Sequence, residues 1–359
     1  MSRTAFVWHE GCFWHNAGDG ALYEPAGGYV ENLGQAESPE SKRRVKNLLE
    51  RSGLIDGLNV IKPRPAALAD LLRFHTREHI DNVRNLSRAG GGLCGDSAIV
   101  GRGSYEIALL SAGCAISAAE AVVLGAARNA YALTRPPGHH AQSGSGMGYC
   151  IFNNIAVAAM YAREVLGVGK ILIVDWDAHH GNGTEDAFYG DDSVMFVSLH
   201  QDGLEPIGRG LVSHRGRGAG EGYTVNIPLP PGSGDAAYAY AFEQVVLPVA
   251  RMFAPELVMV SAGQDANIFD PLARMMLSAN AYRRMTGELM SLAGGRVVCI
   301  HEGGYCPAYV PFCTHAIIEQ LSGITTDVQD PFIYAMAGTG YDKLWPHQRD
   351  AVDEARPRP

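Results

Sequence analysis

Four ionisable residues fall within six positions directly after an apolar run, in the segment 171–183, which reads ILIVDWDAHHGNG. Because side chains alternate across a strand, Asp175, Asp177 and His179, spaced by two, start on the same side of it. Carboxylates and imidazoles are ligands of Zn²⁺. An incidental polar strand end is the plainer alternative, but unpaired ionisable groups are costly to bury. We therefore predict a metal site at the carboxyl end of this strand, where open parallel sheets bind ligands.

A second apolar run, 258–265, reads VMVSAGQD and ends in Asp265. Taken alone, Asp265 could serve as a helix cap. Beside Asp177 and His179 it completes a set of three protein ligands. Three ligands leave a fourth position open to water or substrate, which distinguishes catalytic zinc sites from structural ones. The two segments together predict a catalytic zinc centre.

Two further segments supply groups that such a centre could use. The segment 134–141, TRPPGHHA, places His139 and His140 after a turn that two prolines make rigid. Adjacent histidines are ordinary surface residues in many loops, but next to a hydrolytic metal they suit general base and general acid roles. The segment 301–305, HEGGY, ends in Tyr305, whose hydroxyl could donate to a polarised carbonyl. A lone tyrosine usually serves packing, so this assignment depends on the other three segments.

The elements that position these residues alternate along the chain. Strand candidates are 4–8, 129–134, 170–176, 194–200, 223–228, 256–261 and 296–301. Helix candidates are 40–51, 66–85, 105–124, 153–166, 236–252, 279–292 and 307–321. This alternation predicts an α/β fold with an open, mainly parallel sheet, helices on both faces and the active site at the strand carboxyl ends. Both halves of the chain contribute strand ends, which predicts one catalytic domain over 1–359 with a flexible tail over about 342–359.

The composition excludes several classes of protein. The 359 residues are 47% hydrophobic and 19% charged, which is too apolar for a disordered chain. The net charge of −9 argues against a nucleic-acid-binding surface, and we find no signal peptide or membrane span. The seven cysteines are scattered without a CxxC pair. They predict reduced thiols and a cytoplasmic protein with no nucleic-acid or membrane partner.

In this order, the four segments resemble those of the zinc-dependent histone deacetylase superfamily, and the resemblance covers about residues 4–325. They are most similar to its class II branch, together with the bacterial histone deacetylase-like amidohydrolases and the acetylpolyamine amidohydrolase group. The resemblance implies an arginase-like open α/β fold. It also implies one catalytic Zn²⁺ per chain, held by Asp177, His179 and Asp265.

The same resemblance assigns roles around the zinc. His139 and His140 match the tandem catalytic histidines, of which His140 would take the proton of the attacking water. Tyr305 matches the donor that stabilises the oxyanion formed on the carbonyl. Asp175 matches an acid that pairs with His139 and helps to hold a structural potassium ion. Asn182 stands where class I members have an aspartate behind His140, and asparagine is the class II pattern.

One or two structural potassium ions and a tunnel for an acyl-lysine are also implied by the resemblance. The remaining potassium ligands would be Ser198 and Leu199 at a first site, and Phe188, Val194 and Tyr223 at a second. The residues that match walls of the substrate tunnel are Gly148, Tyr149 and Leu272.

Two positions depart from the family's pattern. Gln264 replaces an aromatic residue beside a zinc ligand, either as neutral packing or as an amide that contacts groups around the metal. Glu205 stands near the second wall of the tunnel, where relatives often carry phenylalanine. A carboxylate there would favour a substrate with a second cationic nitrogen, unless Glu205 points to solvent and Leu204 lines the tunnel instead. On the opposite rim, Asp96 could hold the backbone amides of a substrate.

These assignments predict a zinc-dependent amidohydrolase that removes acetyl or another small acyl group from acyl-lysine or a related small amide. The acidic rim leaves an acetylpolyamine or another small-molecule amide as the alternative substrate. A dinuclear manganese ureohydrolase similar to arginase is a remote alternative, because this chain reads Asp-x-Asp-x-His rather than Asp-x-His-x-Asp. A non-catalytic acyl-ligand binder would be expected to lack a metal ligand or Tyr305. Members of the family often assemble through rim loops, so a homodimer or homotetramer is expected.

Overall fold

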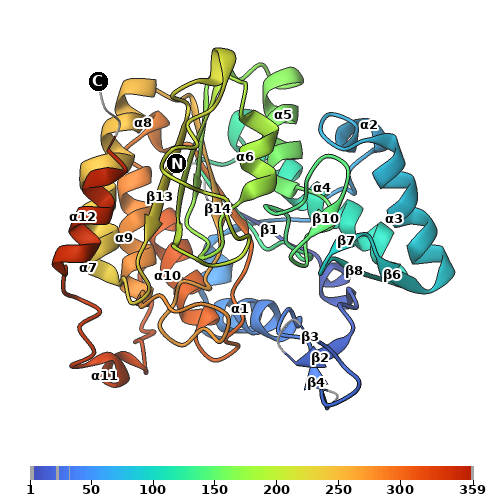
Figure 1. Cartoon of the computed structure of the whole chain (residues 1–359), viewed down its shortest axis with the longest axis horizontal. Helices are drawn as coiled ribbons and strands as arrows, with labels where there is room; N and C mark the ends of the chain where they lie inside the picture. Colours follow the sequence, from blue (N-terminus) through green and yellow to red (C-terminus); the bar gives the residue numbers. More distant parts are fainter. Residues whose placement is uncertain (1–3, 22–23, 32, 357–359) are drawn as a thin grey trace.

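A parallel eight-stranded sheet forms the centre of the molecule in the computed structural model, which describes residues 4–21, 24–31 and 33–356 (Figure 1). Every neighbouring pair of its strands is parallel. In spatial order the strands are β13 (Thr224–Leu229), β12 (Val194–Gln201), β11 (Ile171–Asp175), β14 (Leu257–Ala262), β15 (Val297–His301), β9 (Ala130–Ala132), β1 (Ala5–Val7) and β5 (Asn59–Ile61). The predicted α/β fold with a parallel sheet is therefore confirmed.

Helices cover both faces of this sheet, and further helices pack at its periphery. They are α1 (Glu40–Arg51), α2 (Leu68–Leu71), α3 (Arg77–Ala89), α4 (Ser104–Val123), α5 (Asn154–Glu164), α6 (Asn182–Phe188), α7 (Asp235–Ala241), α8 (Leu247–Phe253), α9 (Ala279–Leu289), α10 (Val310–Ser322), α11 (Ile333–Met336) and α12 (Pro346–Glu354). In Figure 1, α8 and α9 lie to the left of the strands, and α4, α5 and α6 lie to their right. Because both faces are covered, β11, β12, β14 and β15 are buried along their whole lengths, as their continuously apolar sequences require.

Short strands add small sheets beside the main one. They are β2 (Asp19–Ala21), β3 (Glu24–Pro25) and β4 (Leu33–Gly34) in one sheet, β6 (Gly91–Leu93) with β8 (Ile99–Gly101), and β7 (Gly95–Asp96) with β10 (Gly146–Met147). None of these short strands was expected from the sequence, and neither was the edge strand β5. Two or three residues are too few to display the alternation that predicts a strand.

The helix predicted over 66–85 is instead two helices, α2 and α3. Thr76 ends the continuity because its hydroxyl accepts a hydrogen bond from the backbone N–H of His79, which caps the start of α3. The buried ring of His75 in the break accepts a hydrogen bond from the backbone N–H of Asn153 at 2.9 Å. A tertiary contact therefore interrupts a segment whose apolar spacing is helical throughout.

The segment expected to be a flexible tail contains α12. Its Gln348 and Val352 are buried, and the Gln348 amide donates to the backbone carbonyl of Gly232 at 3.1 Å. The helix thus packs on the main domain, which differs from the expectation for 342–356. The last three residues, 357–359, lie outside the described part of the chain.

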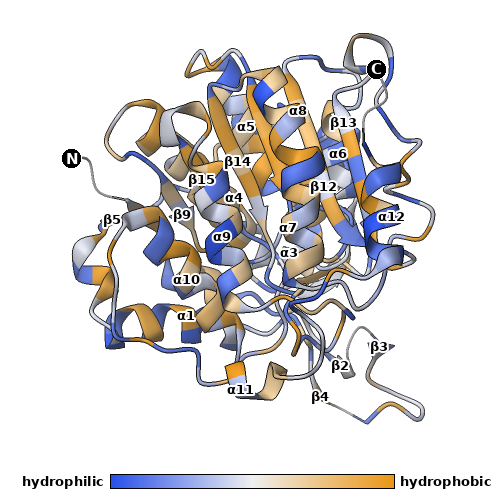
Figure 2. Cartoon of the chain, turned by 90° about the vertical axis from the view of Figure 1, so that its left-hand side faces the viewer, coloured by the Kyte–Doolittle hydropathy of each residue, from blue (hydrophilic) through white to orange (hydrophobic). Residues whose placement is uncertain are grey.

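The apolar helix α4 belongs to the core. By length and composition alone it could cross a membrane, but 67% of its most apolar stretch is buried inside the protein. Figure 2 shows apolar strands and helix faces gathered toward the interior of the molecule. All seven cysteines are free thiols, and six of them are buried.

Candidate active site and metal centre

Three potential metal ligands meet where two adjacent strands end. Asp177 and His179 follow β11, and Asp265 follows β14, the strand beside it in the sheet. His179 Nδ1 lies 2.7 Å from Asp265 Oδ2 and 3.2 Å from Asp177 Oδ1. One ligand atom from each of the three residues lies within 4.8 Å of the others. The three predicted zinc ligands therefore converge on one point.

The chemistry of these three groups fits a divalent cation. Asp177 and Asp265 are at most 1% exposed, and two buried carboxylates repel each other unless a positive charge lies between them. Burial, and then the negative charge of Asp177, raise the pKa of Asp265 well above its usual range. Burial lowers the pKa of His179, but hydrogen bonds with both carboxylates outweigh it and raise this pKa well above its usual range. A bound metal ion would take the place of that shared proton, and the donor set of two carboxylates and one imidazole suits Zn²⁺.

Backbone groups hold the two carboxylates in place. Asp177 Oδ2 accepts a hydrogen bond from Gly303 N at 2.9 Å, and Asp265 Oδ1 accepts one from Ala178 N at 2.7 Å. A Cβ atom on Gly303 would lie 2.7 Å from an oxygen of each carboxylate, so a side chain has no room there. The first glycine after Glu302 in the HEGGY segment is therefore required by the close approach of the backbone to the metal ligands.

The tandem histidines lie beside this centre, in the loop that follows β9. Their ring centroids are 4.0 Å apart, and both side chains are buried. His139 Nδ1 lies 3.0 Å from Asp175 Oδ2, and His140 Nδ1 lies 2.8 Å from Asn182 Oδ1. Both partners are those expected from the resemblance.

These different partners separate the two histidines electrostatically. Burial lowers the pKa of His139, but the carboxylates of Asp177 and Asp175 outweigh it and raise this pKa to about 10. Burial, and then the positive charges of His139 and His179, lower the pKa of His140 well below its usual value. His139 is therefore the cationic member of the pair, and His140 is the neutral one that can accept a proton.

Tyr305 completes the set of polar groups around the metal ligands. Its ring centroid lies 6.4 Å from that of His179 and 5.9 Å from that of Tyr149. Burial, followed by the negative charge of Asp177, raises the pKa of Tyr305 well above its usual value, so the hydroxyl keeps its proton and remains a donor. The backbone N–H of Tyr305 donates to Asp270 Oδ2 at 2.8 Å, which fixes the segment that carries the ring.

A cavity of about 490 Å³ leads to this group of side chains. Its lining includes His140, His179 and Tyr305 from the polar centre. The predicted tunnel residues that also line it are Asp96, Gly148, Tyr149, Glu205 and Leu272. The structure therefore brings all the predicted substrate-binding residues to one cavity.

The sequence left open whether Glu205 or Leu204 forms the second wall of the tunnel, and the structure places both in the lining of the cavity. Glu205 and Leu204 line the cavity, with Glu205 exposed and Leu204 half-buried. Glu205 Oε2 accepts a hydrogen bond from the backbone N–H of Ile207 at 3.1 Å. Arg274 also lines the mouth, and its guanidinium donates to the carbonyl of Ala273 at 2.7 Å. The rim thus carries charges of both signs, whereas the sequence indicated only acidic ones.

Gln264 points away from the metal ligands. Its amide oxygen accepts a hydrogen bond from Thr314 Oγ1 at 3.2 Å, and its amide nitrogen lies 3.4 Å from the hydroxyl of Tyr131. That hydroxyl is 2.7 Å from His301 Nδ1. Gln264 therefore belongs to a buried polar network behind the site. Because its amide is hydrogen-bonded, this side chain does more than fill space.

The residues predicted to hold potassium lie on and around β11, β12 and β13. Asp175 and Ser198 are paired across β11 and β12, and both are buried. Leu199 follows in β12, and Phe188, Val194 and Tyr223 lie at the end of α6, at the start of β12 and just before β13. The carbonyls of Phe188 and Tyr223 accept backbone hydrogen bonds, from Asp191 N at 3.0 Å and Phe196 N at 2.9 Å.

Two acidic residues of the site were missed in the sequence. Asp270 accepts hydrogen bonds from the backbone N–H groups of Tyr305 and Leu272, and Glu302 accepts them from Gly138 and His139. Asp270 precedes a proline, a pair that favours a turn and could have drawn attention to it. Glu302 lies inside the HEGGY segment, where only the glycines and the tyrosine were given a use.

A parallel sheet with a buried two-aspartate, one-histidine centre beside a cavity is the arrangement expected of a metal-dependent hydrolase. The Histone deacetylase domain family matches residues 35–321 of the chain. A histone deacetylase-like amidohydrolase from Pseudomonas aeruginosa is 49% identical over 336 residues, which cover 92% of this chain and 88% of that protein. Histone deacetylase 8 of Arabidopsis thaliana is 36% identical over 350 residues, covering 93% and 92%.

A solved structure agrees with these sequence matches. The crystal structure of the HDA15 HD domain superposes with a TM-score of 0.83 at 34% identity, covering 98% of this chain and 99% of that one. The chain belongs to the histone deacetylase family. It is accordingly an amidohydrolase of a zinc-dependent deacetylase family, and Asp177, His179 and Asp265 form its candidate metal site. This family match argues against the alternative of a dinuclear manganese ureohydrolase.

Proposed function

We propose that this enzyme hydrolyses the amide of an acyl-lysine side chain, or of a related small amide, and releases acetate or another small carboxylate. The observation that carries the proposal is the cavity of about 490 Å³ with His140, His179 and Tyr305 in its lining. Tyr149, Leu272 and Met147 give it apolar walls that suit the aliphatic chain of an acylated lysine.

Different residues of the chain have different roles in amide hydrolysis. When bound by Asp177, His179 and Asp265, zinc supplies Lewis acidity that polarises the substrate carbonyl and acidifies water. The Nδ1–H of His140 donates to Asn182 Oδ1, which leaves Nε2 to accept the proton of the attacking water. Tyr305 donates its hydroxyl proton in a hydrogen bond to the carbonyl oxygen as negative charge develops there. The cationic His139 can then protonate the departing amine.

A substrate panel tests the proposal on the zinc-loaded enzyme. It compares acetyl-lysine peptides, trifluoroacetyl-lysine, acetylpolyamines and small aryl or alkyl amides by kcat/KM. We expect the acyl-lysine compounds to be the best substrates, because the walls of the cavity are mostly apolar. A clear preference for acetylpolyamines would support the alternative with an acidic rim, and no turnover of any member would contradict the proposal.

Replacing Tyr305 by Phe is expected to lower kcat by about 10²–10³-fold, the usual cost of one donor to a developing oxyanion. Zinc content should remain at one per chain, because Tyr305 is not among the three proposed ligands. Steady-state kinetics and metal analysis measure the two effects. Tyr238→Phe is the matched control, because the hydroxyl of Tyr238 is buried without a hydrogen-bond partner among the described residues. Equal activity of Tyr305→Phe and Tyr238→Phe would remove the catalytic role.

Replacing Glu205 by Gln tests whether the rim selects cationic substrates. Exposed ion pairs contribute about 0.2–1 kcal/mol, so the preference for an acetylpolyamine over a neutral amide should fall by only about 1.5–5-fold. A Glu205→Phe variant, which restores an aromatic wall, should shift the preference in the same direction. The control is Asp202→Asn, an exposed acid outside the lining of the cavity. A preference unchanged in both Glu205 variants would show that this carboxylate does not select the substrate.

Three further expectations belong to the same proposal. Structural potassium would be held near Asp175 and Ser198, whose pairing across adjacent buried strands supports a cation site there. The seven free thiols support a reducing, cytoplasmic location. Because members of the family often form oligomers, we expect a homodimer or homotetramer. Light scattering, which measures the mass of the protein in solution, would test this expectation.

A further inference from the structure

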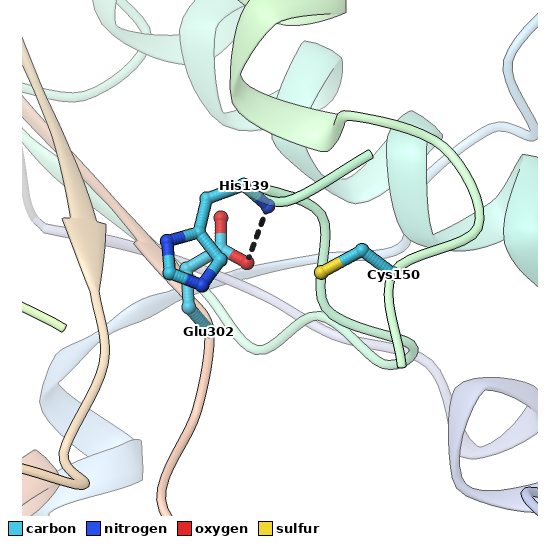
Figure 3. Close-up of side chains that lie close together, drawn as sticks. All are labelled: His139, Cys150 and Glu302. Carbon is cyan, nitrogen blue, oxygen red and sulfur yellow. Dashed lines mark hydrogen bonds between the residues drawn. The ribbon is translucent and has the colours of Figure 1, made fainter. Parts of the chain in front are cut away.

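A buried carboxylate, Glu302, lies behind the tandem histidines. It follows β15 directly and is fully buried. Its Oε2 accepts hydrogen bonds from Gly138 N at 2.6 Å and from His139 N at 3.2 Å. Figure 3 shows the Glu302 carboxylate next to His139, with the hydrogen bond to the His139 backbone nitrogen drawn. One oxygen therefore joins two consecutive peptide groups of the loop that carries both histidines.

The opposite side of the same loop is held by other groups. The carbonyl of His139 accepts a hydrogen bond from Thr184 N at 3.1 Å, and the carbonyl of Ala141 accepts one from Asn153 Nδ2 at 3.1 Å. The loop is thus bonded through its N–H groups to Glu302 and through its carbonyls to two other segments. Removing the bonds on one side would leave two buried N–H groups without a partner, and the loop would move to satisfy them.

The second oxygen of Glu302 makes no such contribution. Oε1 is buried and has no hydrogen-bond partner among the described residues. The thiol of Cys150 lies nearby, since ligand atoms of His139, Cys150 and Glu302 are within 4.8 Å of one another. All the side-chain hydrogen bonds of Glu302 among the described residues are therefore accepted by one oxygen, Oε2, from backbone N–H groups.

We propose that Glu302 is a positioning residue, whose single oxygen holds the Gly138–His139 backbone so that both histidine rings face the metal centre in their reactive orientation. The inference rests on the proposed hydrolytic function of that centre. Glu302 touches neither the metal ligands nor the cavity lining by any hydrogen bond in the described structure, so it acts only through the loop.

Two substitutions separate this positioning role from a role for the negative charge. Glu302→Gln removes the charge but keeps an oxygen at the same reach, whereas Glu302→Asp keeps the charge and withdraws the oxygen by one methylene. We expect Glu302→Gln to retain kcat within about threefold. Glu302→Asp should lose about 10–100-fold in kcat, because a displacement near 1 Å of a catalytic group can cost about 10²-fold. KM and the zinc content of one per chain should change little in either variant.

The readouts distinguish positioning from general stability. Asp70→Asn is the control, because Asp70 is also a buried carboxylate that accepts a backbone N–H, from Ala67 at 2.9 Å, but in α2 outside the cavity lining. We expect Asp70→Asn to lower the melting temperature about as much as Glu302→Asp, whereas its kcat should equal that of the wild type. The inference is overturned if Glu302→Asp keeps wild-type kcat, or if Glu302→Gln loses as much as Glu302→Asp. An inactive wild-type enzyme would instead contradict the proposed function.

Discussion

Asp265→Ala is expected to lose bound zinc and to reduce amide hydrolysis by at least about 10³-fold. The reason is that Asp265 provides one of three protein ligands, and two ligands rarely hold a catalytic zinc. Lewis acidity lowers the barrier by several kcal/mol, and each 1.36 kcal/mol is a factor of ten in rate. Metal analysis after dialysis gives the zinc content, and kcat/KM for an acetyl-lysine peptide gives the activity.

The matched control for this experiment is Asp186→Ala. Asp186 is an exposed acid on α6, where it pairs with Arg209 at the surface. It should keep one zinc per chain and wild-type activity. Full zinc occupancy in Asp265→Ala would contradict the assignment of this residue as a ligand, and an active, zinc-free variant would contradict a zinc-dependent reaction.

His140→Ala is expected to lower kcat by about 10²–10⁴-fold, the usual contribution of a positioned general base. The structure supplies the reason, since His140 is the neutral member of the tandem pair and is oriented by Asn182. Zinc content should be unchanged, because His140 lies outside the set of three ligands. Rapid-quench or steady-state kinetics on the zinc-loaded variant measure the effect.

His315→Ala is a fair comparison for the loss of a buried imidazole. His315 lies in α10, where its Nε2 is 3.2 Å from Ser52 Oγ, and it does not line the active-site cavity. Burial lowers its pKa too, as it does for His140. The two variants should have similar losses of stability and very different kcat values. If their kcat values agree, the proton transfer is not carried by His140.

Much of the site was accessible from local sequence. Asp177, His179 and Asp265 were identified because each follows an apolar strand, and strand ends in a parallel sheet share one edge. The seven predicted strands were found for the same kind of reason, since most of them are runs of five or more largely apolar residues. In each case the pattern that allows the prediction is formed by residues close together in the sequence.

Other features could not be found in this way. The packing of α12 depends on contacts with β13 and α7. Asp270 serves Tyr305 from 35 positions away. In each case the partner is distant in the sequence, so no local pattern marks it.

The sequence by itself determined the chemical identity of this protein: an apolar strand followed by carboxylates and a histidine, tandem histidines, and a tyrosine after two glycines. Only the tertiary structure decided how those groups are used. It separates His139 from His140 through their different partners, and it places a carboxylate 164 positions from Gly138 against that residue's backbone. The physical reason is that residue type and spacing specify which groups exist. Their protonation and orientation depend on burial and on partners that strand order brings together.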